Sequence, residues 1–143
     1  VLAYSQQPLE QLVAQARSAG TSALVRIDAF VRDWFALLVE DAWFRQSFEI
    51  LLNKTELTDA MSTTLERERR LTQSMIETLQ GLVEDAQQQG DIPADQSAGQ
   101  LALMIYTQLM GVTQTWLFAP GLFDLNEQRD FFAERVLRAL QQP

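Results

Sequence analysis

The 143-residue sequence contains no cysteine and no histidine. Their absence excludes disulfides, zinc fingers, thiol nucleophiles, and every catalytic triad or metal cluster that depends on histidine. The GxSxG, HExxH and glycine-rich phosphate-loop motifs are also missing, and acidic pairs such as Glu84 and Asp85 are typical of solvated helix faces. We therefore expect a protein that is not an enzyme and that needs no metal or other cofactor.

Long apolar runs and an excess of basic residues are missing as well. No segment approaches the roughly 20 apolar residues of a membrane-spanning helix, and no basic start followed by an apolar stretch marks a signal peptide. We expect a cytoplasmic protein with no membrane partner. Eleven Lys and Arg against nineteen Asp and Glu give a formal net charge of −8, so the surface repels phosphate. Any binding of DNA would require a segment outside this sequence.

Glycine and proline are scarce, at six and four residues, and apolar residues recur at helical spacing almost throughout. With 47% hydrophobic residues, the pattern predicts one all-α domain, a bundle of about six helices. Pro8 inside the first helix predicts a break or a restart there. Because the sequence starts within a helical pattern and without methionine, we expect a fragment of a longer protein. The expected helices are Leu2–Arg17, Ser22–Val39, Ala42–Leu52, Thr58–Gln89 with Thr58 as N-cap, Asp95–Phe118, and a last helix capped by Asn126.

The predicted core is rich in aromatic residues and methionine, and a few polar residues fall at or near its apolar faces. Glu68 and Thr72, for example, lie within the apolar stripe of the fourth helix. Apolar walls with a few polar groups are typical of ligand pockets, although a filled core would show the same composition. The candidates for lining a pocket are Trp34, Phe35, Leu65, Glu68, Thr72, Met75, Met104 and Gln108.

Glu68 has two interpretations. A carboxylate at this position must be paired, solvated or protonated, because burying an unpartnered charge costs several kcal/mol. A ligand cation could be its partner, and surrounding rings would add cation–π attraction of roughly 0.5 to 2 kcal/mol, which favours flat cationic compounds. Alternatively, Glu68 reaches water or forms a salt bridge to Arg69 or to an arginine of the second helix such as Arg26. The alternative predicts no preference for cations.

The fifth helix is apolar on two sides and therefore needs two surfaces to bury against. Together with the amphipathic last helix it could pack inside one bundle, or the two could form the interface of a two-fold dimer. A strip of small and amide-bearing residues between the apolar sides would let another helix come close. The candidates for a dimer interface are Met110, Gly111, Gln114, Leu117, Phe131, Phe132, Arg135 and Val136.

The C-terminal third resembles the TetR family, in the branch of the multidrug-efflux repressors. The resemblance is carried by Asp91-Ile92-Pro93-Ala94-Asp95, followed by an apolar helix that ends Trp116-Leu117-Phe118-Ala119-Pro120-Gly121-Leu122-Phe123-Asp124-Leu125. It is clearest from about Thr58 to Leu140. It implies an all-α C-terminal domain that dimerises through its last two long helices and holds a largely apolar pocket on which the candidate lining residues converge. It also implies that the helix-turn-helix DNA-binding domain precedes this sequence and is absent from it.

These observations together predict the ligand-sensing and homodimerisation domain of a TetR-type repressor. A small hydrophobic or amphiphilic effector would favour one arrangement of the helices and so alter binding of operator DNA by the full-length protein, which would control an efflux system. The competing interpretations are a helical interaction or dimerisation module without a ligand and a small-molecule carrier. A cavity would distinguish the first interpretation from the second.

Overall fold

A computed structural model describes residues 2–18, 20–52 and 59–142, and the side chains of residues 8–18, 20–46, 48, 63 and 65–142. All regular secondary structure in these ranges is helical, which confirms the all-α prediction. The six helices agree with the apolar periodicity of the sequence to within a few residues. They are α1 (Leu2–Ser18), α2 (Ala23–Glu40), α3 (Ala42–Leu52), α4 (Asp59–Gln88), α5 (Ala98–Phe118) and α6 (Leu125–Gln141).

Short polar side chains cap the starts of four helices. Ser22, Asp41, Ser97 and Asp124 each accept a hydrogen bond from the backbone N–H three residues further on, at 3.1 to 3.3 Å. The predicted cap at Asn126 is wrong, because Asp124 caps α6 two residues earlier. Helix α5 likewise begins three residues later than expected because Ser97 caps it.

Helix α4 ends close to its predicted boundary. Gly90 follows the helix with a φ of +83°, a backbone conformation that a glycine adopts without steric cost. The predicted N-cap at Thr58 lies outside the described residues.

The prediction that Pro8 breaks the first helix is wrong, because α1 runs through it without interruption. A proline inside a helix costs about 3 kcal/mol, since it removes one hydrogen bond and crowds the preceding turn. The residues that follow Pro8 on one face of α1 are all buried, namely Leu9, Leu12, Val13 and Ala16. Their packing offsets the local cost of the proline.

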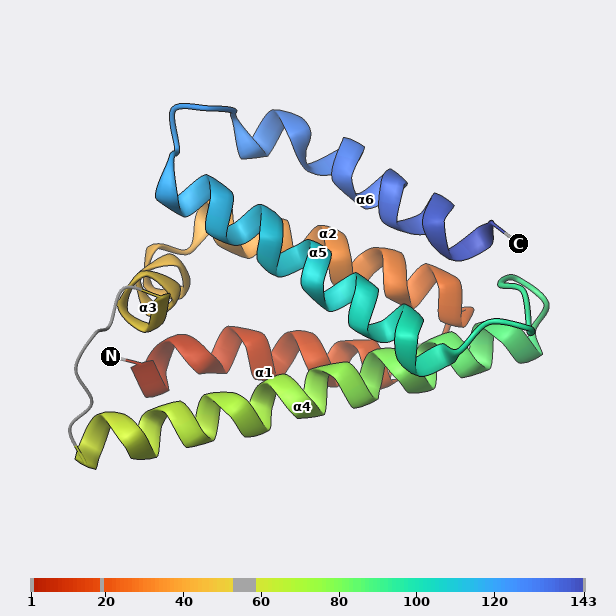
Figure 1. The fold of residues 1–143 in the computed structure, drawn as a ribbon, viewed down its shortest axis with the longest axis horizontal. Coiled ribbons are helices and arrows are strands. Elements are labelled where there is room, and N and C mark those ends of the chain that lie inside the picture. The colour runs from red at the N-terminus through yellow and green to blue at the C-terminus, as the bar shows by residue number, and fades with distance from the viewer. Residues whose placement is uncertain (1, 19, 53–58, 143) are drawn as a thin grey trace.

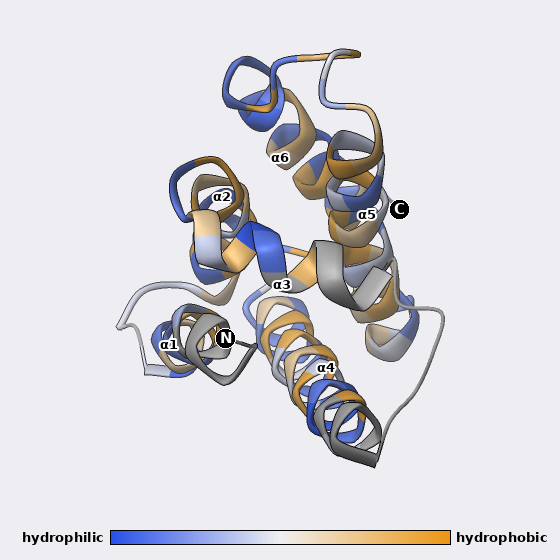
Figure 2. Ribbon diagram, turned by 90° about the vertical axis from the view of Figure 1, so that its left-hand side faces the viewer, coloured by the Kyte–Doolittle hydropathy of each residue, from blue (hydrophilic) through white to orange (hydrophobic). Residues whose placement is uncertain are grey.

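Helix α2 is the centre of the bundle. It packs against each of the other five helices, and its buried residues are Ala23, Ile27, Phe30, Val31, Trp34, Phe35 and Leu38. Figure 1 shows α1 and α4 side by side on one side of the molecule, α6 on the opposite side, and α2 and α5 between them. Helix α3 crosses one end of the bundle, as Figure 2 shows from that end. The two most extensive contacts between helices are those of α4 with α5 and of α2 with α6.

Candidate ligand site and dimer surface

Trp34 is part of the filled core where α2, α3 and α5 meet. Its ring is fully buried and packs against Phe44 and Phe48 at centroid distances of 5.8 and 5.6 Å. The indole N–H donates to the Thr113 hydroxyl at 3.0 Å, and that hydroxyl donates to the Leu109 carbonyl at 2.6 Å. The polar groups of this pair are therefore satisfied within the chain. The sequence analysis missed Thr113, although it lies one turn after Leu109 on the apolar face of its helix.

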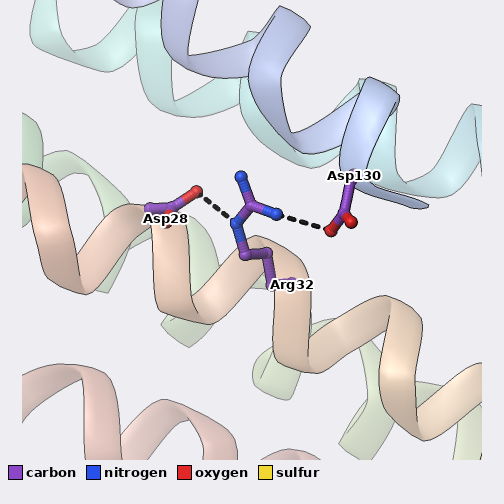
Figure 3. A network of polar contacts seen from close by, with 3 residues as sticks. All are labelled: Asp28, Arg32 and Asp130. Atoms are coloured by element: carbon purple, nitrogen blue, oxygen red, sulfur yellow. Dashed lines mark hydrogen bonds and ion pairs between the residues drawn. The ribbon is translucent and has the colours of Figure 1, made fainter. Parts of the chain in front are cut away.

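Phe35 faces a different neighbour from Trp34, since consecutive residues of a helix point about 100° apart. Its ring packs against Phe132 of α6 at a centroid distance of 6.1 Å. Beside these rings, Arg32 of α2 donates to Asp28 at 2.8 Å and to Asp130 of α6 at 2.6 Å (Figure 3). We call these five residues the α2–α6 seam. The structure thus joins a predicted pocket residue, Phe35, to a predicted dimer residue, Phe132, inside one chain.

Three polar side chains meet on the line of contact between α4 and α5. The Thr72 hydroxyl lies 3.4 Å from the Tyr106 hydroxyl, and all three of Glu68, Thr72 and Tyr106 are half-buried. Burial raises the pKa of Tyr106 above its ordinary value of 10.0; the hydrogen bond with Thr72 lowers this pKa, and the negative charge of Glu68 raises it. We call these three residues the α4–α5 seam. Its polar groups are close enough to interact with one group of a ligand.

The other predicted pocket residues are distributed around this seam. Met75 is buried on α4, one turn beyond Thr72, and Leu65 is half-buried on the same helix. Met104 packs against the core, but it lies two positions before Tyr106, which places it on another side of α5. Gln108 lies two positions after Tyr106 and is exposed, so the structure does not bring it to the seam. Tyr106 was not predicted as a site residue because its neighbours at helical spacing, Leu103 and Met110, are apolar.

The arginines that could pair with Glu68 in the structural interpretation have other contacts in the described part of the chain. Arg69 lies 3.6 Å from the carboxylate of Glu66. Arg26 donates to the carbonyl of Ala16 at 3.4 Å. Both interpretations of Glu68 stay predictions.

One face of α5 is exposed along its whole length. Leu103, Thr107, Gly111, Gln114 and Phe118 are spaced three or four residues apart and are all exposed, Phe118 by 91%. We call these residues the α5 outer stripe. A Cβ atom added at Gly111 would have no other atom within 4 Å, so this stripe has open space beside the helix backbone. The sequence analysis included Gly111 and Gln114 in the dimer interface but missed Leu103 and Phe118.

The predicted interface residues of α6 divide into an exposed and a buried set. Phe131 and Arg135 are exposed, and the Arg135 guanidinium lies over the Phe131 ring at 5.1 Å. Val136 is 2% exposed and belongs to the core of the chain. Phe132 is half-buried and packs against the rings of Phe35 and Phe123 in the same chain. Met110 and Leu117 of α5 are also half-buried. A partner could therefore contact Phe131 and Arg135 directly, but Val136 has almost no surface left.

Four cavities lined by described residues lie outside both seams. Two of them, about 200 and 230 Å³, lie between α1 and α2, and a third of about 260 Å³ lies where α1, α2 and α4 meet. A fourth, of about 440 Å³, lies beside the C-terminal ends of α2 and α5 and the start of α6. The pocket predicted around Trp34 and Met75 is not one of these four and stays a prediction. Within the described part of the chain, no helix is long and apolar enough to cross a membrane, and no three acidic side chains are grouped to hold a metal ion.

Comparisons with known proteins identify the family to which this six-helix domain belongs. Residues 27–142 match the C-terminal region of the MAATS-type transcriptional repressors, so the chain belongs to this family of TetR-type regulators. The resemblance noted in the sequence is thereby confirmed. The chain is also 28% identical over 90 residues to the HTH-type transcriptional regulator AcrR of Shigella flexneri. That alignment covers 62% of this chain and 42% of AcrR, so the chain matches less than half of that relative.

Solved structures share the fold over almost the whole chain. NalD, the secondary repressor of the MexAB-OprM multidrug efflux pump in Pseudomonas aeruginosa, superposes with a TM-score of 0.82 at 21% identity, covering 99% of this chain and 72% of NalD. FadR from Bacillus subtilis, in complex with stearoyl-CoA, gives a TM-score of 0.73 at 15% identity, covering 95% of this chain and 70% of FadR. At these identities the likeness shows the fold.

Proposed function

We propose that this chain is the effector-sensing and homodimerisation region of a cytoplasmic repressor that controls an efflux system. The effector is a small hydrophobic or amphiphilic compound, and operator DNA is bound by a separate domain of the full-length protein. Effector binding favours one arrangement of the helices, and the arrangement sets the distance between the two DNA-binding domains of the dimer. AcrR is a transcriptional regulator and NalD is a repressor of a multidrug efflux pump, and the similarity to both supports the regulatory part of this proposal.

The observation that carries the effector-binding part is the α4–α5 seam. Glu68, Thr72 and Tyr106 place a carboxylate and two hydroxyls among apolar neighbours such as Met75. A few polar groups on an apolar wall are the usual composition of a site that binds and orients an amphiphilic molecule. The negative charge of Glu68 favours a ligand that carries a cation or a hydrogen-bond donor.

The dimerisation part depends on the surface that α5 and α6 leave uncovered. The α5 outer stripe and the Phe131–Arg135 pair combine exposed apolar, aromatic and arginine side chains. Aromatic residues and arginine are enriched in interfaces, and Gly111 allows a partner helix to approach closely. A second copy of the chain would cover this surface in a two-fold arrangement, the commonest symmetry of oligomers.

The effector site is tested by titrating the protein with a flat cationic aromatic dye and with a neutral compound of similar shape. We expect Glu68→Gln to weaken binding of the cationic dye by about 1 kcal/mol or more and to leave the neutral compound unaffected. Glu66→Gln, two residues away and exposed, is the matched control and should change neither affinity. Equal affinities of wild type and Glu68→Gln for the dye would contradict the role of Glu68 and support the salt-bridge interpretation.

The dimer is tested by light scattering at micromolar protein concentration, where we expect twice the chain mass of 16.3 kDa. Charges in the uncovered surface should break it, so we expect the Gly111→Glu, Phe131→Glu double variant to weaken dimerisation by about 2 kcal/mol or more. Trp43→Glu changes an exposed aromatic residue on α3 and should leave the dimer intact. A wild-type monomer, or a dimer that survives the double variant, would contradict the proposed interface.

The competing functions give different results in the same experiments. An interaction module without a ligand would form the dimer but bind neither the dye nor the neutral compound. A small-molecule carrier would bind the compounds, but binding would not change the affinity of the full-length protein for operator DNA. Electrophoretic mobility shifts with and without the bound compound therefore separate a repressor from a carrier.

A further inference from the structure

The cavity where α1, α2 and α4 meet is independent of the α4–α5 seam. It has a volume of about 260 Å³ and lies between the last turn of α1, the first turn of α2 and the C-terminal half of α4. Its walls carry Arg17 and Arg26 on one side and Glu77, Gly81 and Asp85 of α4 on the other. The cavity is smaller than typical sites for drug-sized ligands, so its size fits a small molecule.

The two arginines of this cavity have donor groups to spare. Arg17 donates from Nε to the Thr78 hydroxyl at 2.8 Å and from Nη2 to the Ser74 hydroxyl at 3.1 Å. Arg26 donates from Nη1 to the Ala16 carbonyl at 3.4 Å. A guanidinium has five N–H groups, and neither arginine forms an ion pair within 4.0 Å in the described part of the chain. Two arginines without an ion pair at one cavity are unexpected in a chain with a net charge of −8.

Arg26 lines this cavity and also the neighbouring cavity of about 200 Å³ between α1 and α2. Its Nε is buried and has no hydrogen-bond partner among the residues that the structure describes. Because a ligand cannot reach a donor that the protein covers, the groups of Arg26 that are available to a ligand are its other N–H groups.

The wall formed by α4 combines two acidic residues with a glycine. Glu77, Gly81 and Asp85 are spaced four residues apart and therefore share one face of the helix. Glycine inside a helix is destabilising by about 1 kcal/mol relative to alanine. A Cβ atom built at Gly81 would have no other atom within 4 Å, so the α4 backbone borders open space at this point of the cavity wall. A ligand can therefore approach the backbone of α4 there.

We propose that this cavity binds a small zwitterion that carries one carboxylate and one ammonium group, such as a free amino acid. The carboxylate accepts hydrogen bonds from Arg17 and Arg26, and the ammonium group lies beside Glu77 and Asp85. A simple anion would be repelled by the two carboxylates and a simple cation by the two guanidinium groups. A molecule with both charges avoids both repulsions.

The test follows the Gly81 backbone amide by NMR during titration of the full chain with ω-amino acids, from glycine to 6-aminohexanoate. For each length, the carboxylic acid without the amine and the amine without the acid are the matched probes. We expect at least one amino acid to shift the Gly81 amide signal and to bind about tenfold or more tightly than both of its matched probes. A carboxylate that binds as tightly as its amino acid would overturn the proposal, as would a cavity in which no probe shifts the signal at about 10 mM.

Variants locate the binding in this cavity. We expect Arg26→Gln and Asp85→Asn each to weaken the amino acid by about tenfold, while Arg138→Gln, a change of another arginine on α6, has no effect. Gly81→Leu fills the cavity without changing any charge. It should abolish binding and not lower the midpoint of thermal unfolding, because leucine is the better helix former. Binding that survives both Arg26→Gln and Gly81→Leu would show that the amino acid binds elsewhere and would overturn the proposal.

Discussion

The α2–α6 seam and the α4–α5 seam both place charged or polar groups between two long helices, but they use them differently. In the α2–α6 seam, Arg32 lies within 2.8 Å of both of its carboxylate partners, and its pKa is raised, chiefly by its hydrogen bond with Asp28. In the α4–α5 seam, the hydroxyls of Thr72 and Tyr106 lie 3.4 Å apart, a longer separation than either contact of Arg32. Polar groups with short partners inside the chain hold the scaffold together, whereas loosely associated ones can exchange their contact for a ligand.

The largest expected effect is a loss of stability when an aromatic ring of the α2–α6 seam is removed. Phe35 is 1% exposed, so Phe35→Ala should lower the free energy of unfolding by about 3 to 5 kcal/mol through lost burial and a cavity. Leu122→Ala, at a residue 71% exposed, is the control and should stay within about 0.5 kcal/mol. Urea denaturation followed by circular dichroism, at one fixed protein concentration, measures both. A loss below about 1 kcal/mol for Phe35→Ala would mean that α6 is not anchored by these rings.

The ion pairs of the same seam should contribute much less than its rings. Asp130 is mostly exposed, and exposed ion pairs contribute about 0.2 to 1 kcal/mol. We expect Asp130→Asn to destabilise the protein within this range at about 0.1 M NaCl and to have almost no effect at about 1 M, where charges are screened over a few ångströms. Unfolding at the two salt concentrations measures this. A loss that matches that of Phe35→Ala and persists at high salt would show that the charges, and not the rings, hold α6 to α2.

The fold could be predicted because apolar spacing determines which face of each helix is buried. The bounds of α3 agree with the prediction at both ends, and α2 differs by one residue at each end. The start of α6 was missed because two residues close together, Asp124 and Asn126, are both good caps, and periodicity does not discriminate between them.

The residues that contact one another in each seam could not be predicted from apolar spacing. Periodicity places Trp34 and Phe35 on the buried side of one helix, but it does not say that one meets α3 and α5 and the other meets α6. The pair Arg32 and Asp130 is separated by 98 positions in the sequence and leaves no local signal. Thr72 was predicted because it lies within an apolar stripe, yet its partner Tyr106 follows from the packing of α4 against α5. Pairing between helices is a property of the tertiary structure.

The smallest expected effect is spectroscopic, and it tests the α4–α5 seam directly. The chain has two tyrosines, Tyr4 and Tyr106, so a Tyr4→Phe background isolates the second. In this background, a pH titration followed by absorbance at the tyrosinate band should give a pKa above the ordinary value of 10.0, chiefly because burial disfavours the charged phenolate. Since the folded state then holds the proton more tightly than the unfolded state, the free energy of unfolding is unaffected below about pH 10 and falls as the pH rises through it.

Two substitutions in the seam should move this pKa in opposite directions. Glu68→Gln removes a negative charge that repels the phenolate, so the pKa of Tyr106 should fall toward 10.0. Thr72→Val removes a hydrogen bond that favours the phenolate, so the pKa should rise further. Neither change should alter the stability at pH 7 as much as Phe35→Ala, because neither empties the core. Shifts of the same sign, or no shift in either variant, would mean that the three side chains do not meet, and the proposed effector site would lose the polar cluster on which it depends.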